Sequence, residues 1–145
     1  SAFNNDIIDV PLVKKQNNTG IVAKLGKDAK TIITTLESFK HFSLIECKPV
    51  TGRFHQIRIN LQYRNHPIVA DEVYGGSIPY LSQIIPRYKN SSRREENPMM
   101  TRFALHAKRL NFKTPSGKEI MVDAPYPKDF ATLIKIIRKN DRSIL

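Results

Sequence analysis

Alternating apolar and polar positions dominate the first third of the chain and predict β-strands. Three runs, rich in β-branched residues or strictly alternating, predict strands over residues 20–25, 29–39 and 41–48. Turn residues separate these runs, so we predict an antiparallel meander of three strands. An extended segment over residues 7–13, held open by Pro11, comes before them.

The period of the pattern changes in the middle of the chain. Ile57 and Leu61 stand four residues apart, which is the spacing of one helix face. Asn65 tolerates the left-handed backbone that ends many helices, and Pro67 cannot continue one. We therefore predict a short helix over residues 55–64 whose apolar face is buried.

The last third of the chain predicts a strand pair followed by a helix. We expect strands over residues 102–112 and 118–124, joined by a turn at 114–117. A C-terminal amphipathic helix over residues 128–139, packed on the sheet, is predicted by four apolar residues at helical spacing: Phe130, Leu133, Ile134 and Ile137.

The stretch 77–101 shows neither the alternation of a strand nor the spacing of a helix face. It contains three prolines and a polar run, so we expect a surface excursion. The remaining elements predict an α+β fold, a mostly antiparallel sheet with short helices, formed as a single segment over residues 1–145.

Net charge is the strongest signal of the composition. The 145 residues include 24 Lys and Arg against 13 Asp and Glu, a formal net charge of +11. A basic domain of this size points to a polyanionic partner, most often a nucleic acid. The alternatives are a basic protein without such a partner and an anionic membrane surface, but no basic amphipathic helix of the kind that binds membranes stands out.

Several other classes of protein do not fit the sequence. No apolar run reaches the roughly 18 residues of a membrane span, and the first residues lack the pattern of a secretory signal. The single cysteine, Cys47, can form no internal disulfide, which favours a reducing compartment, and we expect the cytoplasm.

Metal binding and cysteine chemistry are also disfavoured. The four histidines (His41, His55, His66 and His106) lack the paired spacing of metal ligands, so we expect no metal. Cys47 lies inside a predicted strand, where a structural thiol is the usual role. A hydrolase that uses His55 or His106 has little support, because His106 lies between Leu105 and Ala107 and reads as a core histidine.

Two arginines are the strongest candidates for chemistry. Arg58 lies between two isoleucines on the predicted helix, and a guanidinium close to a core requires an anionic partner. That partner is either an acid of this chain, such as Asp71 or Glu72, or a group that takes part in a reaction. Arg53 follows the turn residue Gly52 and is either a phosphate ligand or a solvated turn residue.

The spacing of these residues resembles a known family. Thr51 to Arg58 reads TGRFHQIR, residues 66–71 read HPIVAD, and Tyr74-Gly75 follows. Together with the LHA at 105–107, these motifs are similar to the signature of the RluA-type RNA pseudouridine synthases. The resemblance extends from about residue 7 to residue 126. It departs from the family at three positions: Phe54, where a small or hydroxylated residue is usual, Asn60, where His is usual, and Ala70, where Gly is usual.

The resemblance implies an enzyme that converts uridine to pseudouridine in RNA, ribosomal or transfer, without cofactor or metal. In that family an aspartate of an upstream H-R-L-D motif is the nucleophile, and it pairs with the arginine that matches Arg58. Ile57 would then form a wall of the active site. The residues expected to bind RNA are Arg53, His55, Gln56 and Arg102.

This sequence contains no H-R-L-D motif. We therefore expect the chain to be the C-terminal half of a pseudouridine synthase catalytic domain, inactive alone, with the missing N-terminal half of the same enzyme as its partner. The alternative is a non-catalytic basic module that only binds RNA.

Overall fold

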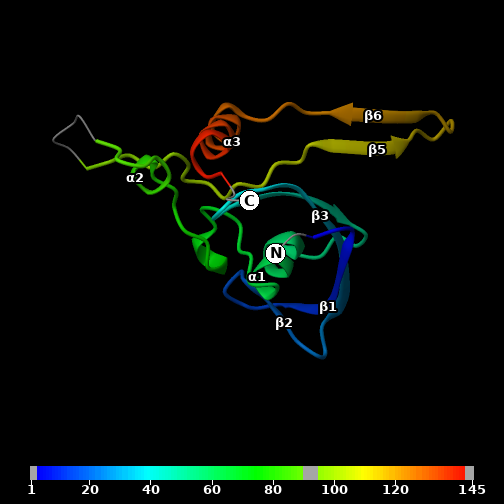
Figure 1. Ribbon diagram of the computed structural model, residues 1–145. Helices are drawn as coiled ribbons and strands as arrows, with labels where there is room; N and C mark the ends of the chain where they lie inside the picture. The colour runs from blue at the N-terminus through cyan, green and yellow to red at the C-terminus, as the bar shows by residue number, and fades with distance from the viewer. Residues whose placement is uncertain (1–2, 90–94, 143–145) are drawn as a thin grey trace.

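The computed structural model describes residues 3–89 and 95–142. Its largest element is a four-stranded antiparallel sheet with the order β2-β1-β3-β4. The sheet curves around the helix α1 (Gln56–Tyr63), as Figure 1 shows. Its strands are β1 (Asp6–Lys14), β2 (Gly20–Val22), β3 (Lys27–Ser38) and β4 (Ser43–Pro49).

The strand order corrects the predicted meander. The extended segment is a full strand, β1, and it lies between β2 and β3, with Leu12 opposite Val22 and Ile8 opposite Thr31. Pro11 is compatible with this central place because its carbonyl accepts a hydrogen bond from Ala23 on the β2 side. The amide and carbonyl of one strand residue point to the same side, so the missing proline N–H leaves the β1–β3 ladder intact. The predicted pairing of β3 with β4 is confirmed.

The main core lies between the sheet and α1. Side chains from β1 and β3 meet Ile59 and Leu61 of α1. The almost fully buried ones on the sheet are Ile8, Leu12, Ala29, Thr31 and Ile33. Each such isoleucine or leucine contributes about 1.5–3 kcal/mol through its burial. The predicted helix is confirmed, but its buried face is rotated from the one expected: Ile59, Asn60 and Leu61 face the sheet, whereas Ile57 is only half-buried.

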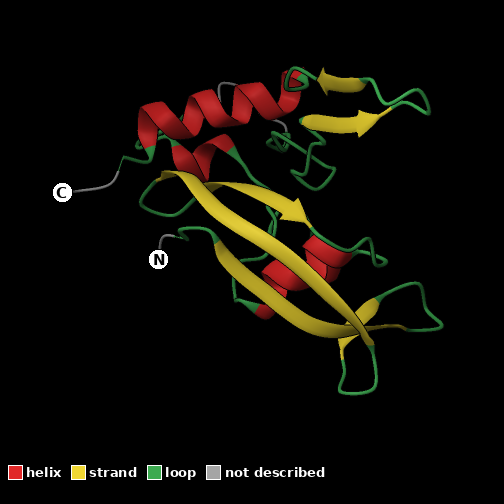
Figure 2. Cartoon of the chain, turned by 90° about the vertical axis from the view of Figure 1, so that its right-hand side faces the viewer, coloured by secondary structure: helices red, strands yellow, loops and turns green. Residues whose placement is uncertain are grey.

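A second core surrounds the C-terminal helix α3 (Lys128–Asn140), which is confirmed with its four predicted apolar residues buried. It packs against Ile84 of the short helix α2 (Leu81–Ile84) and against Phe42 and Leu44 at the near end of the sheet. An ion pair between Arg138 and Glu37 ties its last turns to that end of the sheet. Hydrogen bonds between His41 and Asp141 add to it. Figure 2 shows α3 lying across the end of the sheet, whereas the sequence predicted only that it packs on the sheet.

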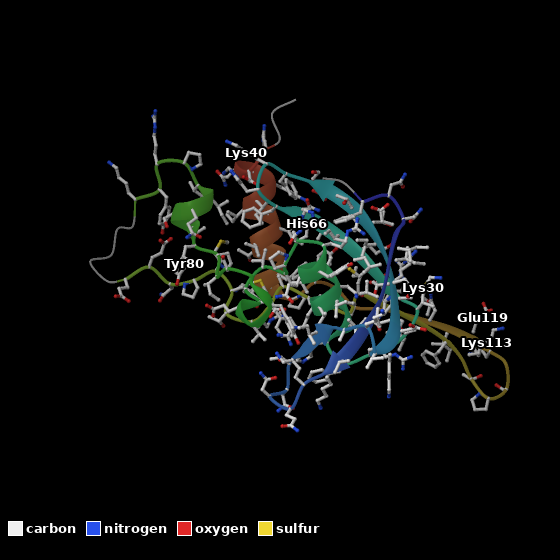
Figure 3. All side chains as sticks on the ribbon, turned by 90° about the horizontal axis from the view of Figure 1, so that it is seen from below. Lys30, Lys40, His66, Tyr80, Lys113 and Glu119 are labelled. Carbon is white, nitrogen blue, oxygen red and sulfur yellow. The ribbon has the colours of Figure 1, made fainter. Side chains whose placement is uncertain are left out.

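The remaining strands form a hairpin that projects from the body of the molecule (Figures 1 and 2). It pairs β5 (Arg109–Lys113) with β6 (Glu119–Asp123), and Lys113 and Glu119 mark its far end in Figure 3. The predicted strand over 102–112 is therefore too long, because residues 102–108 cross the body as an irregular segment. His106 of this segment contacts the backbone carbonyl of Ala124 through Nε2. This contact connects the segment to the end of β6 and gives the imidazole a structural role.

The hairpin carries apolar side chains that nothing covers among the described residues. Leu110 and Val122 face each other across the two strands. They are 61% and 50% exposed, and Met121 is 67% exposed. No helix in the described part of the chain is long and apolar enough to cross a membrane.

Candidate active site

Arg58 is held by an aspartate of this chain. Its Nε donates to Oδ2 of Asp71 and its Nη2 donates to Oδ1, both at 2.8 Å. The Asp71 side chain is 1% exposed and that of Arg58 is 11% exposed. Asp71 raises the pKa of Arg58 above its ordinary value, so the guanidinium stays charged. Of the two partners that the sequence left open, the structure therefore provides the one within the chain.

Two aromatic rings fix the plane of this guanidinium. Cζ of Arg58 lies 4.1 Å from the ring centroid of Phe103 and 4.8 Å from that of Tyr74. A guanidinium is attracted to the face of an aromatic ring, and the attraction is stronger where water is excluded. The bidentate ion pair and the two rings together leave the Arg58 side chain little freedom.

His55 holds the remaining nitrogen of Arg58. Its Nε2 lies 3.1 Å from Nη1 of Arg58, and its Nδ1 lies 2.7 Å from the hydroxyl of Tyr74. Arg58 can only donate, so Nε2 accepts and Nδ1 carries the proton that is donated to Tyr74. The backbone N–H of Gly20 also donates to the Tyr74 oxygen, at 2.9 Å. His55 has a left-handed backbone, with φ 51°, at the position just before α1, and this places its ring beside Arg58.

The His55 imidazole should titrate below the ordinary histidine range. Burial and then the cation of Arg58 lower its pKa, and Asp71 opposes them less strongly. The unfolded chain, with a histidine pKa of about 6.5, therefore binds more protons than the folded one between the two pKa values. The contribution of His55 to stability is present above about pH 6.5 and is lost as the pH falls toward the folded-state pKa. An NMR titration of the His55 Cε1 proton should give a midpoint below 6.5, and a midpoint at or above that value would contradict the arrangement.

The contacts of Arg58 leave two of its donors available. A guanidinium carries five N–H groups. Within the described residues, two of them bind Asp71 and one binds His55, so one N–H remains on each Nη atom. A further acceptor, such as a second carboxylate, can take up both.

Arg58 also lines a pocket of about 370 Å³. The pocket includes Arg53, His55, Gln56 and Ile57 from the predicted site, and Phe103 and Leu105 from the irregular segment. No carboxylate of the described residues lines it, so its charge comes from the two arginines. A pocket with this charge suits an anionic ligand or a catalytic acid supplied from elsewhere.

Arg53 and Gln56 have different roles in this pocket. Arg53 is exposed and donates from Nε to the carbonyl of Asp28 at 2.9 Å, which leaves its outer nitrogens at the surface. Gln56 is 4% exposed and its amide is used entirely inside the protein. It accepts from the Thr51 hydroxyl and the Arg53 backbone, and it donates to the Lys30 carbonyl and the Thr31 hydroxyl. This corrects its expected contact with RNA, because Gln56 has no free polar atom and instead joins the turn before α1 to β3.

Arg102 lies outside the pocket lining. It forms a bidentate ion pair with Asp129 in the first turn of α3, with its Nη2 2.8 Å from Oδ1. The pair is exposed, so Arg102 is engaged by the protein and yet open to solvent. The structure does not bring it together with the other predicted RNA-binding residues.

Sequence reasoning missed two residues of this site, Tyr74 and Phe103. Tyr74 belongs to the 3-10 helix η1 (Glu72–Tyr74), and Phe103 lies 45 positions beyond Arg58 in the chain. The signal for Tyr74 was its place in the motif that also contains Asp71. No local pattern distinguished Phe103.

Cys47 is not equipped for catalysis. Burial, together with the nearby Glu46, raises the pKa of its thiol to about 11, so it is protonated at neutral pH. Among the residues that the structure describes, no three His, Cys, Asp or Glu side chains gather as a metal site would require.

Replacing Gly76 with Ala should disturb the loop that holds Asp71. Gly76 donates its N–H to the Asp71 carbonyl at 2.7 Å. An added Cβ would collide with the carbonyl oxygen of Ile68 and would lie 2.8 Å from the Asp71 nitrogen. These are backbone atoms that cannot turn aside, so we expect a loss on the order of 2 kcal/mol or more in urea denaturation. Gly52→Ala is the control, because nothing lies within 4 Å of its added Cβ. Equal stability of the two variants would contradict the prediction.

The chain is similar to known RNA pseudouridine synthases. A family model described as RNA pseudouridylate synthase matches residues 2–63. Ribosomal large subunit pseudouridine synthase D of Neisseria meningitidis serogroup B is 39% identical over 116 residues, which cover 78% of this chain and 29% of that protein. The uncharacterized RNA pseudouridine synthase YlyB of Bacillus subtilis is 36% identical over 138 residues, which cover 92% of this chain and 39% of that protein.

Solved structures share the fold. Human RNA pseudouridylate synthase domain containing 4 has a TM-score of 0.59 at 18% identity, covering 92% of this chain and 56% of that one. Human RNA pseudouridylate synthase domain containing 1 has a TM-score of 0.58 at 21% identity, covering 96% of this chain and 61% of that one. The predicted fold class, α+β with a mostly antiparallel sheet, is confirmed.

The chain spans about a third of the length of curated relatives that it matches. The part that they share includes the motif from Thr51 to Arg58, whose residues build the pocket. The chain therefore belongs to the RluA-type RNA pseudouridine synthase family and matches part of that family's domain.

Proposed function

We propose that the protein to which this chain belongs is an RNA pseudouridine synthase. The reaction breaks the bond between C1′ of the ribose and N1 of uracil and forms a bond between C1′ and C5. The C5 hydrogen is lost to water and N1 regains a proton, so the product is an isomer of uridine. The target base has to leave its stack to reach a pocket of this kind, as it does for other enzymes that act on a base.

The single observation that carries the proposal is the state of Arg58. Its guanidinium is charged, held by Asp71, His55 and two aromatic rings, and keeps two donors in a pocket that no acid of the described residues lines. A catalytic aspartate from outside this chain could accept hydrogen bonds from both of these N–H groups. The charge of Arg58 would keep that aspartate ionised and would fix its orientation.

The other pocket residues receive roles in the same proposal. Ile57 is half-buried and would form an apolar wall for the uracil ring. Arg53, exposed at the rim, would bind an RNA phosphate. His55 would act as a positioning residue for Arg58, since both of its ring nitrogens are engaged inside the protein.

We propose further that this chain is the C-terminal half of the catalytic domain and that a preceding half completes it. The much greater length of the relatives supports this division. The apolar side chains of the β5–β6 hairpin support it as well, because exposed apolar strands usually pack against another part of the protein. Of the surface excursion predicted over 77–101, residues 90–94 lie outside the described part of the chain, and Ile84 and Met100 are buried in the core around α3.

The names of the relatives guide the choice of substrate. Several of them are called ribosomal large subunit pseudouridine synthase C or D, so we propose ribosomal RNA as the first substrate to test and transfer RNA as the second. The enzyme would act in the cytoplasm, without a metal, a cofactor or a membrane.

Tritium release is the experiment that tests this function. The protein at its full encoded length is incubated with large-subunit ribosomal RNA, or with transfer RNA, that carries tritium at C5 of uridine. Formation of the C1′–C5 bond releases the tritium to water, and its release is the expected result. RNA that is bound but releases no tritium in either case would overturn the enzymatic function and favour a non-catalytic RNA-binding module.

A further inference from the structure

Phe54 is an exposed aromatic ring at the edge of the active site. It is 36% exposed and directly precedes His55, and both of its sequence neighbours, Arg53 and His55, line the pocket. Its ring is stacked on the His55 ring, with centroids 3.7 Å apart and planes 24° from parallel. Nζ of Lys14 stands 4.5 Å from the Phe54 centroid. Because the imidazole fills one face of the ring, the ammonium stands over the other.

The Phe54 ring is held rigidly although it lies at the surface. The His55 ring beneath it is fixed by Tyr74 through Nδ1 and by Arg58 through Nε2. A flat ring in a fixed orientation loses little conformational entropy when another flat group stacks on it. The face under Lys14 is the one open to such a group, since Lys14 is exposed and its flexible stem can move aside.

Cations gather around this ring. Lys14 and Lys15 are exposed at the end of β1, and Lys27, opposite Leu12 in the register of β1 with β3, is exposed beside them. Arg53 reaches the same corner, because its Nε donates to the carbonyl of Asp28, the residue after Lys27. Proteins that bind single-stranded nucleic acid combine these two features, an aromatic ring for a base and cations for the backbone.

A purely structural role explains the position of Phe54 less well. A residue that only supported His55 would be buried against it, and an aliphatic side chain would serve. Here a phenylalanine is placed at the surface, stacked on its neighbour and beneath an exposed cation.

We propose that Phe54 is a stacking platform for an unpaired RNA base next to the target nucleotide, with Lys14 and Arg53 binding the flanking phosphates. The choice of RNA as ligand rests on the proposed function. Stacking of one base on an aromatic side chain contributes about 1–3 kcal/mol and does not depend on which base it is. The platform would thus strengthen binding of the strand that carries the target uridine without selecting its sequence.

The test measures RNA affinity by fluorescence anisotropy, with the protein at its full encoded length and a labelled single-stranded oligouridylate as probe. Phe54→Leu keeps apolar bulk and removes the aromatic face, so it should weaken binding by about 5- to 150-fold. Phe54→Trp keeps a larger aromatic face and should bind within about threefold of wild type. Lys14→Gln should lower the slope of log K against log salt by about 0.7, the value for one phosphate contact on a single strand. Tyr63→Leu is the matched control, since Tyr63 is 52% exposed at the opposite end of α1 and should bind normally.

The outcomes separate this proposal from the proposed function. Wild-type affinity in Phe54→Leu, or an equal loss in Phe54→Trp, would overturn the stacking platform. A wild-type protein that does not bind the oligouridylate would overturn it together with the RNA ligand. A protein that binds RNA through Phe54 but releases no tritium would overturn the enzymatic function alone.

Discussion

Replacing Arg58 with lysine should reduce pseudouridine formation by at least about 100-fold, the loss that follows removal of one fixed electrostatic contact in an active site. Lysine keeps the charge but not the planar fork that binds Asp71 through two atoms and His55 through a third. It would therefore pair with Asp71 and leave a second carboxylate without its donors. RNA affinity should change little, because the Arg58 side chain is almost buried and is engaged inside the protein.

Single-turnover tritium release and anisotropy measure these two effects separately. Circular dichroism shows whether the variant is folded. Two separate variants of Arg53, an exposed arginine of the same pocket, serve as matched controls: Arg53→Lys and Arg53→Ala. Arg53→Ala should weaken RNA binding and lower the salt slope by about 0.7, and both variants should retain turnover at saturating RNA. Near-normal turnover in Arg58→Lys would exclude the proposed role of Arg58.

The elements that could be predicted from the sequence are those defined by local periodicity. The helices α1 and α3 and the turn between β5 and β6 all follow from residues within a dozen positions of one another. Asn65, with φ 60°, lies just beyond α1 as its tolerance of the left-handed backbone indicated. Within α1, however, periodicity alone did not show which residues face the sheet, because Ile57 and Ile59 are equally apolar.

The order of the strands could not be predicted in the same way. Neighbouring strands usually pair, which favoured a meander, but β3 pairs with the first strand across a register that runs from Asp6–Ile33 to Leu12–Lys27. A proline such as Pro11 is uncommon in a central strand. Only the direction of its carbonyl, which points toward β2, shows why the proline is tolerated there.

The candidate site, too, could be predicted only where local sequence patterns define it. The motif identified Arg53, His55, Ile57 and Arg58, and the structure places all four around one pocket. The burial of Arg58 was predictable from its apolar neighbours, since a guanidinium on a buried helix must have an anion. The contact with Phe103 was not predictable, because it joins segments that no local rule connects.

The structure also changes what the buried charge of Arg58 implies about a partner outside the chain. Arg58 is paired within this chain, so its burial alone gives no evidence of a missing partner. The evidence is the pair of donors that its contacts leave, in a pocket lined by no acid of the described residues. Asp71 and His55 act as a frame that holds the guanidinium in place before any second carboxylate arrives. Preorganisation of this kind is what electrostatic catalysis requires.

Because Asp71 is the anion that holds Arg58, the stability of the fold should depend strongly on it. Asp71→Asn should lower the free energy of unfolding by about 3–5 kcal/mol, because it leaves Arg58 buried with an uncompensated charge. The asparagine has nearly the same shape, but its amide would turn a donor toward the guanidinium in place of one acceptor. Urea denaturation measures the loss, and the change should appear in the midpoint with little change in slope.

The chain provides a matched control for this loss in Arg102 and Asp129. This pair has the same residue types and the same bidentate geometry, with Nη2 and Oδ1 again 2.8 Å apart, but its side chains are 45% and 38% exposed. Asp129→Asn keeps the oxygen that accepts from the Phe130 N–H. Like Asp71→Asn, it removes the charge and turns a donor toward the guanidinium in place of one acceptor. Solvent screens an exposed pair, so this variant should lose no more than about 1 kcal/mol. Similar losses in the two variants would mean that burial does not set the strength of the Arg58–Asp71 pair, and the account of the frame given above would fail.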